Sequence, residues 1–259
     1  MLASLSCKRC LGIAIPALLP LINLGAKAED QKIEVPVAQP GWYAAIGAGA
    51  AWPANPSASY AERGSLEGID YRLSGSTSVS LSGGAAVEVG MGYDFGSHVR
   101  SELSYVFTRP SLGSSSFQGR LQAAGFTIPF DGSVSGEGSV NTNSIFISGY
   151  YDIATTSRFR PYVGGGIGWT NVSIPAQIFA GVIQIPTGSA GVSARSDGGN
   201  ASAFGYQAKL GVSYLATSNT DLFLEAAYQG NTAVTIQSLS IGALNQFGVR
   251  AGIRYRFGG

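Results

Sequence analysis

The stretch NQFGVRAGIRYRF, residues Asn245–Phe257, decides the fold that this sequence predicts. From Phe247 onward its odd-numbered positions are apolar, whereas its even-numbered positions include Arg250, Arg254 and Arg256. A β-strand points successive side chains to opposite faces, so the segment has one apolar face and one strongly polar face. We interpret it as a membrane strand whose apolar face contacts lipid and whose arginines face a polar, enclosed lumen.

The first 28 residues are predicted to be a secretory signal peptide. Lys8 and Arg9 precede a mostly apolar run, Leu11–Leu24, and the small-residue motif Ala26-Lys27-Ala28 follows. This order of a charged start, an apolar middle and a small-residue end is typical of a cleaved signal. The run is too short for a comfortable spanning helix, which disfavours an uncleaved anchor. Residues 29–40 are polar, contain two prolines and are expected to form a periplasmic lead-in.

The composition favours an all-β membrane protein. Only 12% of the residues are charged, against about a quarter in soluble domains, and 37 are glycine. No apolar run of the mature chain approaches the ~20 residues of a spanning helix. Without the three basic residues of the signal, 13 of the 16 remain against 15 acids, a net of about −2 that gives no basic excess for nucleic acid. Both cysteines, Cys7 and Cys10, lie in the signal, so no disulfide or thiolate metal site is expected.

Eight segments have the alternation of a membrane strand. Most are about ten residues long, which suits a tilted strand that crosses a bilayer. One of them has aromatic residues on both faces, and there we assign Ile145, Ile147 and Tyr151 to the lipid face. The expected strands are residues 41–52, 85–95, 98–108, 143–153, 159–170, 203–216, 221–229 and 245–257.

The connections between these segments alternate in length. Short turns are expected near residues 96–97, 154–158 and 217–220, and long loops over 53–84, 109–142, 171–202 and 230–244. Short turns at one end and long loops at the other are typical of a bacterial outer-membrane barrel. A soluble lipocalin-like barrel would instead need an apolar interior and a charged exterior. We therefore predict an all-β fold: an eight-stranded antiparallel up-and-down transmembrane β-barrel over residues 41–257, with short periplasmic turns and long extracellular loops.

Several segments resemble the outer-membrane β-barrel family, which includes OmpA-like transmembrane domains, opacity-type proteins of the porin family and bacterial surface antigens. They are GYDF (92–95), RSELSYVF (100–107), YYDI (150–153), FRPYVGGGIGW (159–169), LGVSY (210–214) and GIRYRF (252–257). The resemblance implies a multi-pass protein of the bacterial outer membrane and says little about function, because members differ mainly in their loops. It also implies that Tyr255 and Phe257 are the signal for the barrel assembly machinery, although Gly258-Gly259 follow where such chains usually end on an aromatic residue.

Charged residues on the polar faces are expected to line the lumen. An eight-stranded barrel is just wide enough for side chains to fill, so these charges must be paired. One interpretation is a structural network that fills the barrel. The alternative is a narrow channel for ions or small hydrophobic solutes, in which six basic against three acidic residues would favour anions. The expected lumen residues are Glu88, Arg100, Glu102, Arg160, Lys209, Glu225, Arg250, Arg254 and Arg256.

Nothing in the sequence predicts an enzyme, a cofactor or a metal site. The single histidine, His98, is expected beside a short turn as an interfacial polar residue, because no set of catalytic partners accompanies it. Gly164-Gly165-Gly166 is not a phosphate-binding loop, since no helix follows it. We expect these glycines to ease strand bending or to let a bulky neighbour pack.

Membrane contact and surface function are assigned to different parts of the chain. Aromatic residues at the two lipid interfaces are expected to be Trp42, Trp52, Tyr93, Trp169, Tyr214, Tyr228 and Tyr255. The long loops contain the apolar pieces FTIPF (126–130) and IPAQIFAGVIQIP (174–186). These pieces either extend the strands as hairpins beyond the membrane or pack on each other, or they form an exposed patch that binds a partner or a small hydrophobic ligand. We expect a monomer in outer-membrane lipid with a structural and surface-interacting role.

Overall fold

The computed structural model describes residues 40–135, 138–236 and 239–257. The expected signal peptide and nearly all of the lead-in lie outside these residues, as do Gly258 and Gly259. In the described part of the chain no helix has the length and apolar character needed to cross a membrane.

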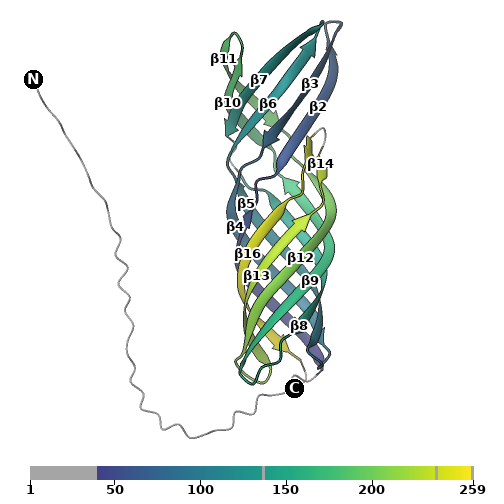
Figure 1. Cartoon of the computed structure of the whole chain (residues 1–259), viewed down its shortest axis with the longest axis vertical. Helices are drawn as coiled ribbons and strands as arrows, with labels where there is room; N and C mark the ends of the chain where they lie inside the picture. Colours follow the sequence, from purple (N-terminus) through teal and green to yellow (C-terminus); the bar gives the residue numbers. More distant parts are fainter. Residues whose placement is uncertain (1–39, 136–137, 237–238, 258–259) are drawn as a thin grey trace, which may run out of the picture. The chain divides into compact units, whose positions relative to one another are not determined.

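Eight antiparallel strands close into a barrel, which confirms the predicted fold (Figure 1). The first and last barrel strands pair with each other, with Ala48 opposite Ala251. The order around the barrel is β1-β16-β13-β12-β9-β8-β5-β4. The strands are β1 (Gly41–Pro53), β4 (Leu81–Asp94), β5 (Val99–Leu112), β8 (Asn141–Asp152), β9 (Phe159–Ile174), β12 (Gly199–Leu215), β13 (Thr220–Asn231) and β16 (Asn245–Arg256).

Side chains alternate along each barrel strand between an exposed apolar face and a buried face. On β16, Ile253 is 48% exposed and its neighbour Arg254 only 3%. On β8, whose two faces both carry aromatic residues, Ile145 and Ile147 face outward whereas Phe146 and Tyr150 are buried in the lumen. The outward face therefore has the character of a lipid-contacting surface, and the charged face is enclosed.

Four barrel strands extend by four residues beyond their predicted bounds at the end with the long connections. β4 begins at Leu81 rather than at residue 85, β5 continues to Leu112, β9 continues to Ile174, and β12 begins at Gly199. A register shift between Ser82 and Gly84 lies within the added part of β4. The polar and glycine-rich sequence there hides the alternation, but backbone pairing with the neighbouring strand continues through it.

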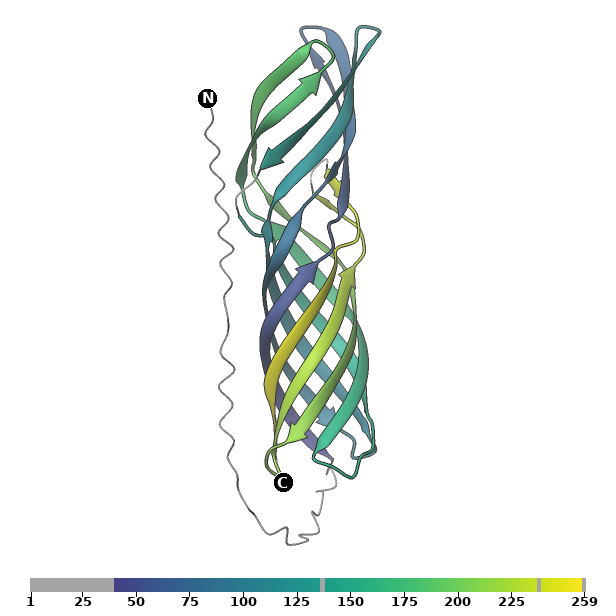
Figure 2. The same cartoon turned by 60° about the vertical axis from the view of Figure 1, so that its left-hand side comes forward.

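The long connections are hairpins and together form a second sheet, which we call the loop sheet (Figure 2). The two apolar pieces form hairpin strands, as one interpretation predicted, and Phe126 and Ile128 of the first piece are also exposed. The order of the strands is β11-β10-β7-β6-β3-β2-β15-β14. They are β2 (Ser57–Leu66), β3 (Ile69–Ser78), β6 (Ser114–Ala123), β7 (Phe126–Ser135), β10 (Gln177–Ile185), β11 (Gly188–Ser196), β14 (Val234–Ile236) and β15 (Leu239–Ile241).

The loop sheet has two chemically different faces. Residues directly opposite in an antiparallel pair share a face. Tyr60, Gly75, Gly119 and Phe130 form one such row and belong to an apolar face, on which Phe117 also lies against Phe130. Another row contains Ser76, Gln118, Asp131 and Gln184 and belongs to a polar face. This alternation explains why a segment rich in serine and glycine still forms regular strands.

Candidate functional site

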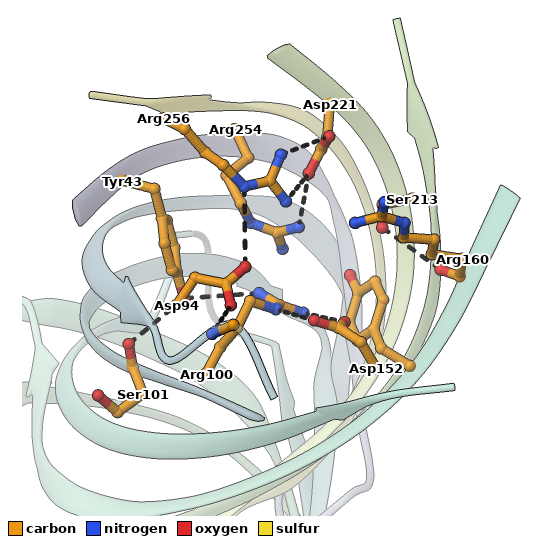
Figure 3. Close-up of polar contacts among 12 residues, drawn as sticks. Tyr43, Asp94, Arg100, Ser101, Asp152, Arg160, Ser213, Asp221, Arg254 and Arg256 are labelled. Atoms are coloured by element: carbon orange, nitrogen blue, oxygen red, sulfur yellow. Dashed lines mark hydrogen bonds and ion pairs between the residues drawn. The ribbon is translucent and has the colours of Figure 1, made fainter. Parts of the chain in front are cut away.

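The first layer of the lumen, at the end with the short turns, is an ion-pair group centred on Asp221. Arg256 donates to both carboxylate oxygens of Asp221, at 2.9 Å from Nη1 to Oδ1 and 2.7 Å from Nη2 to Oδ2 (Figure 3). Arg254 Nη1 lies 3.5 Å from Asp221 Oδ2, and Arg256 Nε lies 3.7 Å from Asp94 Oδ2. Two arginines of β16 are thereby held by an aspartate of the adjacent β13 and one of β4.

The second layer is built around Arg100, whose side chain is fully buried. Its Nε and Nη2 donate to the two carboxylate oxygens of Asp152 at 2.6 and 2.9 Å (Figure 3). Its guanidinium carbon lies 5.8, 4.8 and 5.1 Å from the ring centroids of Tyr43, Tyr150 and Tyr162. A bidentate carboxylate and three aromatic faces therefore replace the water that this cation loses.

The third layer is a cluster of four charges from four strands. Lys209 Nζ lies 2.6 Å from Glu88 Oε1 and 3.3 Å from Glu225 Oε1. Arg250 Nη1 lies 2.9 Å from Glu88 Oε2, and its Nη2 lies 3.3 Å from Glu225 Oε1. We call these four residues the central cluster. Its two cations and two anions balance, which is the arrangement that makes buried charge tolerable.

The two cations of the central cluster are bound differently. Lys209 donates aligned hydrogen bonds to Glu88 and, at 2.9 Å, to the hydroxyl of Tyr150. Tyr150 in turn donates to Glu102 at 3.0 Å. Arg250, although within ion-pair distance of both glutamates, donates no aligned side-chain hydrogen bond to another described residue. Its stabilisation is therefore mainly electrostatic.

Above the charges lies a layer of neutral polar side chains. Gln246 donates to Gln229 at 3.1 Å, Gln229 to Gln207 at 3.0 Å, and Gln207 to Ser148 at 2.8 Å. Thr108 joins this chain by donating to the Gln246 amide oxygen at 3.3 Å. Hydrogen bonds thus run from side chain to side chain across five strands.

Apolar side chains close the end with the long connections. Leu81, Val140 and Val172 form one buried cluster, and Ala58, Ala203, Val234 and Ile241 form another that joins the loop sheet to the barrel. We call the two clusters the apolar cap. A cavity beside the central cluster has a volume of about 10 Å³, and one below the cap has about 20 Å³. A cavity needs roughly 10–15 Å³ of such space to hold one water molecule, so neither cavity is large enough for a hydrated ion.

All nine lumen residues expected from the sequence lie on strands with their polar faces inward. Eight have their partners described above, and Arg160 is half-buried, with its backbone oxygen accepting from Ser213 Oγ at 3.3 Å. The residues expected from the sequence did not include Asp94, Asp152 and Asp221. Adding these three raises the number of acidic residues in the lumen from three to six, against six basic residues. The predicted excess of basic residues in the lumen, which would have favoured anions, is therefore wrong. Strand parity would have found all three, because Asp94 and Asp221 share the faces of Glu88 and Glu225, and Asp152 lies on the face opposite the predicted lipid-facing Ile145 and Ile147.

The aromatic residues expected at the interfaces form two groups at opposite ends of the barrel. Trp42, Tyr93, Tyr214 and Tyr255 lie near the short turns, where Trp42 packs edge-on against Tyr93 with 5.3 Å between the ring centroids. Trp52, Trp169 and Tyr228 lie near the other end. The ten residue steps from Trp42 to Trp52, at ~3.3 Å each and tilted ~40°, span about 25 Å of height, as expected of an outer-membrane barrel.

His98 lies in the short turn between β4 and β5, with a backbone φ of 66° and its ring 6.3 Å from that of Tyr151. The described residues contain no cluster of three or more histidine, cysteine, aspartate or glutamate side chains suited to a metal ion. Packing explains Gly164 of the triple glycine, because a Cβ at this position would overlap the Tyr150 ring.

Residues 132–247, from β7 to the start of β16, match the profile of a family described as surface antigen. The match covers less than half of the chain, whose described residues form a closed eight-stranded antiparallel barrel. No curated protein matches it significantly in sequence.

Solved structures with a similar fold include Neisserial surface protein A, at 18% identity over 85% of this chain and 100% of that chain, with a TM-score of 0.49. Outer membrane protein OprG from Pseudomonas aeruginosa is 12% identical over 85% and 97%, with a TM-score of 0.41. The attachment invasion locus protein Ail of Yersinia pestis is 13% identical over 83% and 99%, with a TM-score of 0.35.

Proposed function

We propose that this barrel is a sealed, non-catalytic scaffold of the bacterial outer membrane that presents the loop sheet at the cell surface. The observation that carries the proposal is the order of layers in the lumen: paired charges, then linked amides, then the apolar cap. An ion that crossed would have to break bidentate pairs such as Arg100–Asp152 and then enter an apolar layer without its water. A role in structure and surface contact therefore suits the lumen better than transport.

Conductance in a planar lipid bilayer tests the sealed lumen. Refolded protein is expected to give no steady current, and Arg250→Glu is expected to leave it silent or to prevent folding. The matched control is Arg195→Glu, a charge reversal at an exposed ion pair with Asp197 on the loop sheet. A steady wild-type current whose ion selectivity changes in Arg250→Glu and not in Arg195→Glu would establish the alternative, a small channel.

We further propose that the chain reaches the outer membrane after cleavage of residues 1–28, as a monomer in outer-membrane lipid. Tyr255 and Phe257, which are exposed and pack edge-on with 5.5 Å between ring centroids, are the proposed contact for the barrel assembly machinery. Edman sequencing of protein from the outer-membrane fraction is expected to begin at Glu29. An intact N-terminus in that fraction would contradict the cleavage.

Surface contact is assigned to the loop sheet, because the barrel wall is covered by lipid and the lumen is filled. Its hairpins carry exposed apolar residues close to their turns, including Ile69, Phe126 and Ile185. Deleting the β10–β11 hairpin removes one edge of the sheet and leaves every barrel strand in place. Unchanged binding of all surface ligands by that variant would exclude this hairpin as the contact.

A further inference from the structure

We propose that the polar face of the loop sheet binds an oligosaccharide that carries carboxylate groups. This inference rests on the proposed function in one respect, namely that the sheet is exposed outside the cell. Two hollows, with volumes of about 760 and 680 Å³, are lined in large part by residues of the polar face, and the lining of the first also includes Phe130 of the apolar face. Both lie along β6, whose residues Gln118, Arg120 and Gln122 point to the same face because they are two positions apart.

The first hollow has the chemistry of a site for hydroxyl groups. Its wall includes Ser76, Gln118, Asp131 and Gln184, one continuous row across four strands, with Arg120 beside it. Amide, carboxylate and guanidinium groups are planar and can each bind two neighbouring oxygens. Within the row the only side-chain hydrogen bond given by described residues is the 3.5 Å contact from Gln118 to Ser76. Most of its donors and acceptors therefore face solvent and are available to a ligand.

The second hollow has the chemistry of a site for an anion. Arg63 of β2 and Arg72 of β3 are directly opposite each other across the strand pair, an arrangement of like charges that destabilises a sheet. Neither is within ion-pair distance of an acid among the described residues, although Asp70 lines the same hollow. A carboxylate placed between the two guanidinium groups would relieve the repulsion and accept charge-assisted hydrogen bonds from both.

The charge of the two hollows selects among polar ligands. The two hollows together contain three arginines and the two aspartates Asp70 and Asp131. This small excess of positive charge fits a ligand with scattered carboxylates and many hydroxyls. A densely sulfated chain would bring its charges against Asp131 as well as against the arginines. An apolar ligand would leave the serine and glutamine groups without partners.

The test is isothermal titration of the full barrel in detergent with three hexasaccharides: hexagalacturonate, neutral maltohexaose and a heparin hexasaccharide. Hexagalacturonate is expected to bind most tightly. Arg72→Gln should weaken its binding about 10-fold, the loss of a charge-assisted contact, and leave maltohexaose unaffected. Asp70→Asn should strengthen binding of hexagalacturonate, because it removes a repelling charge from the hollow. Gln118→Ala should weaken both carboxylated and neutral ligands.

The matched control is Arg195→Gln, which removes an exposed arginine of β11 that lines neither hollow. It should bind hexagalacturonate as the wild type does. Equal losses in Arg72→Gln and Arg195→Gln, tightest binding of the heparin hexasaccharide, or no binding of hexagalacturonate by folded protein would each overturn the proposal. Because binding is measured in detergent, a failure to bind hexagalacturonate can be distinguished from a finding that the barrel conducts ions.

Discussion

At the scale of single residues, Lys209 is the side chain on which the lumen depends most directly. It is the only described cation within 4 Å of both Glu88 and Glu225 that also bonds to Tyr150. Replacing it with methionine keeps the volume and removes the charge, so two buried glutamates share Arg250 alone. We expect Lys209→Met to lower the free energy of unfolding by ~3–5 kcal/mol, the usual result of breaking a buried pair from one side.

Urea unfolding of the barrel in lipid vesicles measures this loss. The double variant Lys209→Met with Glu88→Gln should recover part of the stability, since the remaining Glu225 and Arg250 again balance. Arg195→Gln, which removes an exposed pair, should leave the unfolding midpoint in place. If Lys209→Met alone were as stable as the wild type, the central cluster would not contribute to holding the barrel together.

At the scale of structural elements, neighbouring glycines of β9 have different roles. A Cβ on Gly164 would overlap the ring of Tyr150 from β8, whereas a Cβ on Gly165 would meet only the Gln207 backbone oxygen at 3.7 Å. Gly164→Ala is therefore expected to cost ~1–3 kcal/mol through overpacking in the lumen. Gly165→Ala, one position away on the outward face, is the control and should unfold at the wild-type urea concentration. Equal effects of both substitutions would argue for strand flexibility as the role of these glycines.

Sequence patterns predict the barrel well because each strand carries its own alternation. On β16 the alternation is complete, and the arginines lie inward as expected. Asp152 and Asp221 were missed because each lies at the end of a strand, where the polar face merges with a turn. The loop sheet was beyond prediction for a different reason. Its rows, such as Gln118 with Asp131 and Gln184, join hairpins that are far apart in the sequence, and no local pattern sets that register.

At the scale of the whole molecule, we expect the two aromatic groups to set the depth of the barrel in a membrane. Trp42 belongs to the end with the short turns, and Trp52 and Trp169 belong to the other end. In sealed vesicles with the loop sheet outside, a membrane-impermeant quencher added outside should reduce the fluorescence of a variant that retains only Trp52. A variant that retains only Trp42 should respond only to quencher trapped inside. Equal quenching of both variants by the external quencher would contradict the placement of Trp42 and Trp52 at opposite interfaces.

The hairpins of the loop sheet follow one another in the same order as the barrel strands that carry them. The β2–β3 and β6–β7 hairpins are interior members, whereas β10–β11 and β14–β15 end the sheet at its two edges. Insertions at different places in the loop sheet should therefore be tolerated to different degrees. A foreign peptide grafted at the β10–β11 turn, near residues 186–187, would disturb a single partner strand. The same insert placed within β6 would separate two neighbours at once, so the third long connection is the natural position for display on this scaffold.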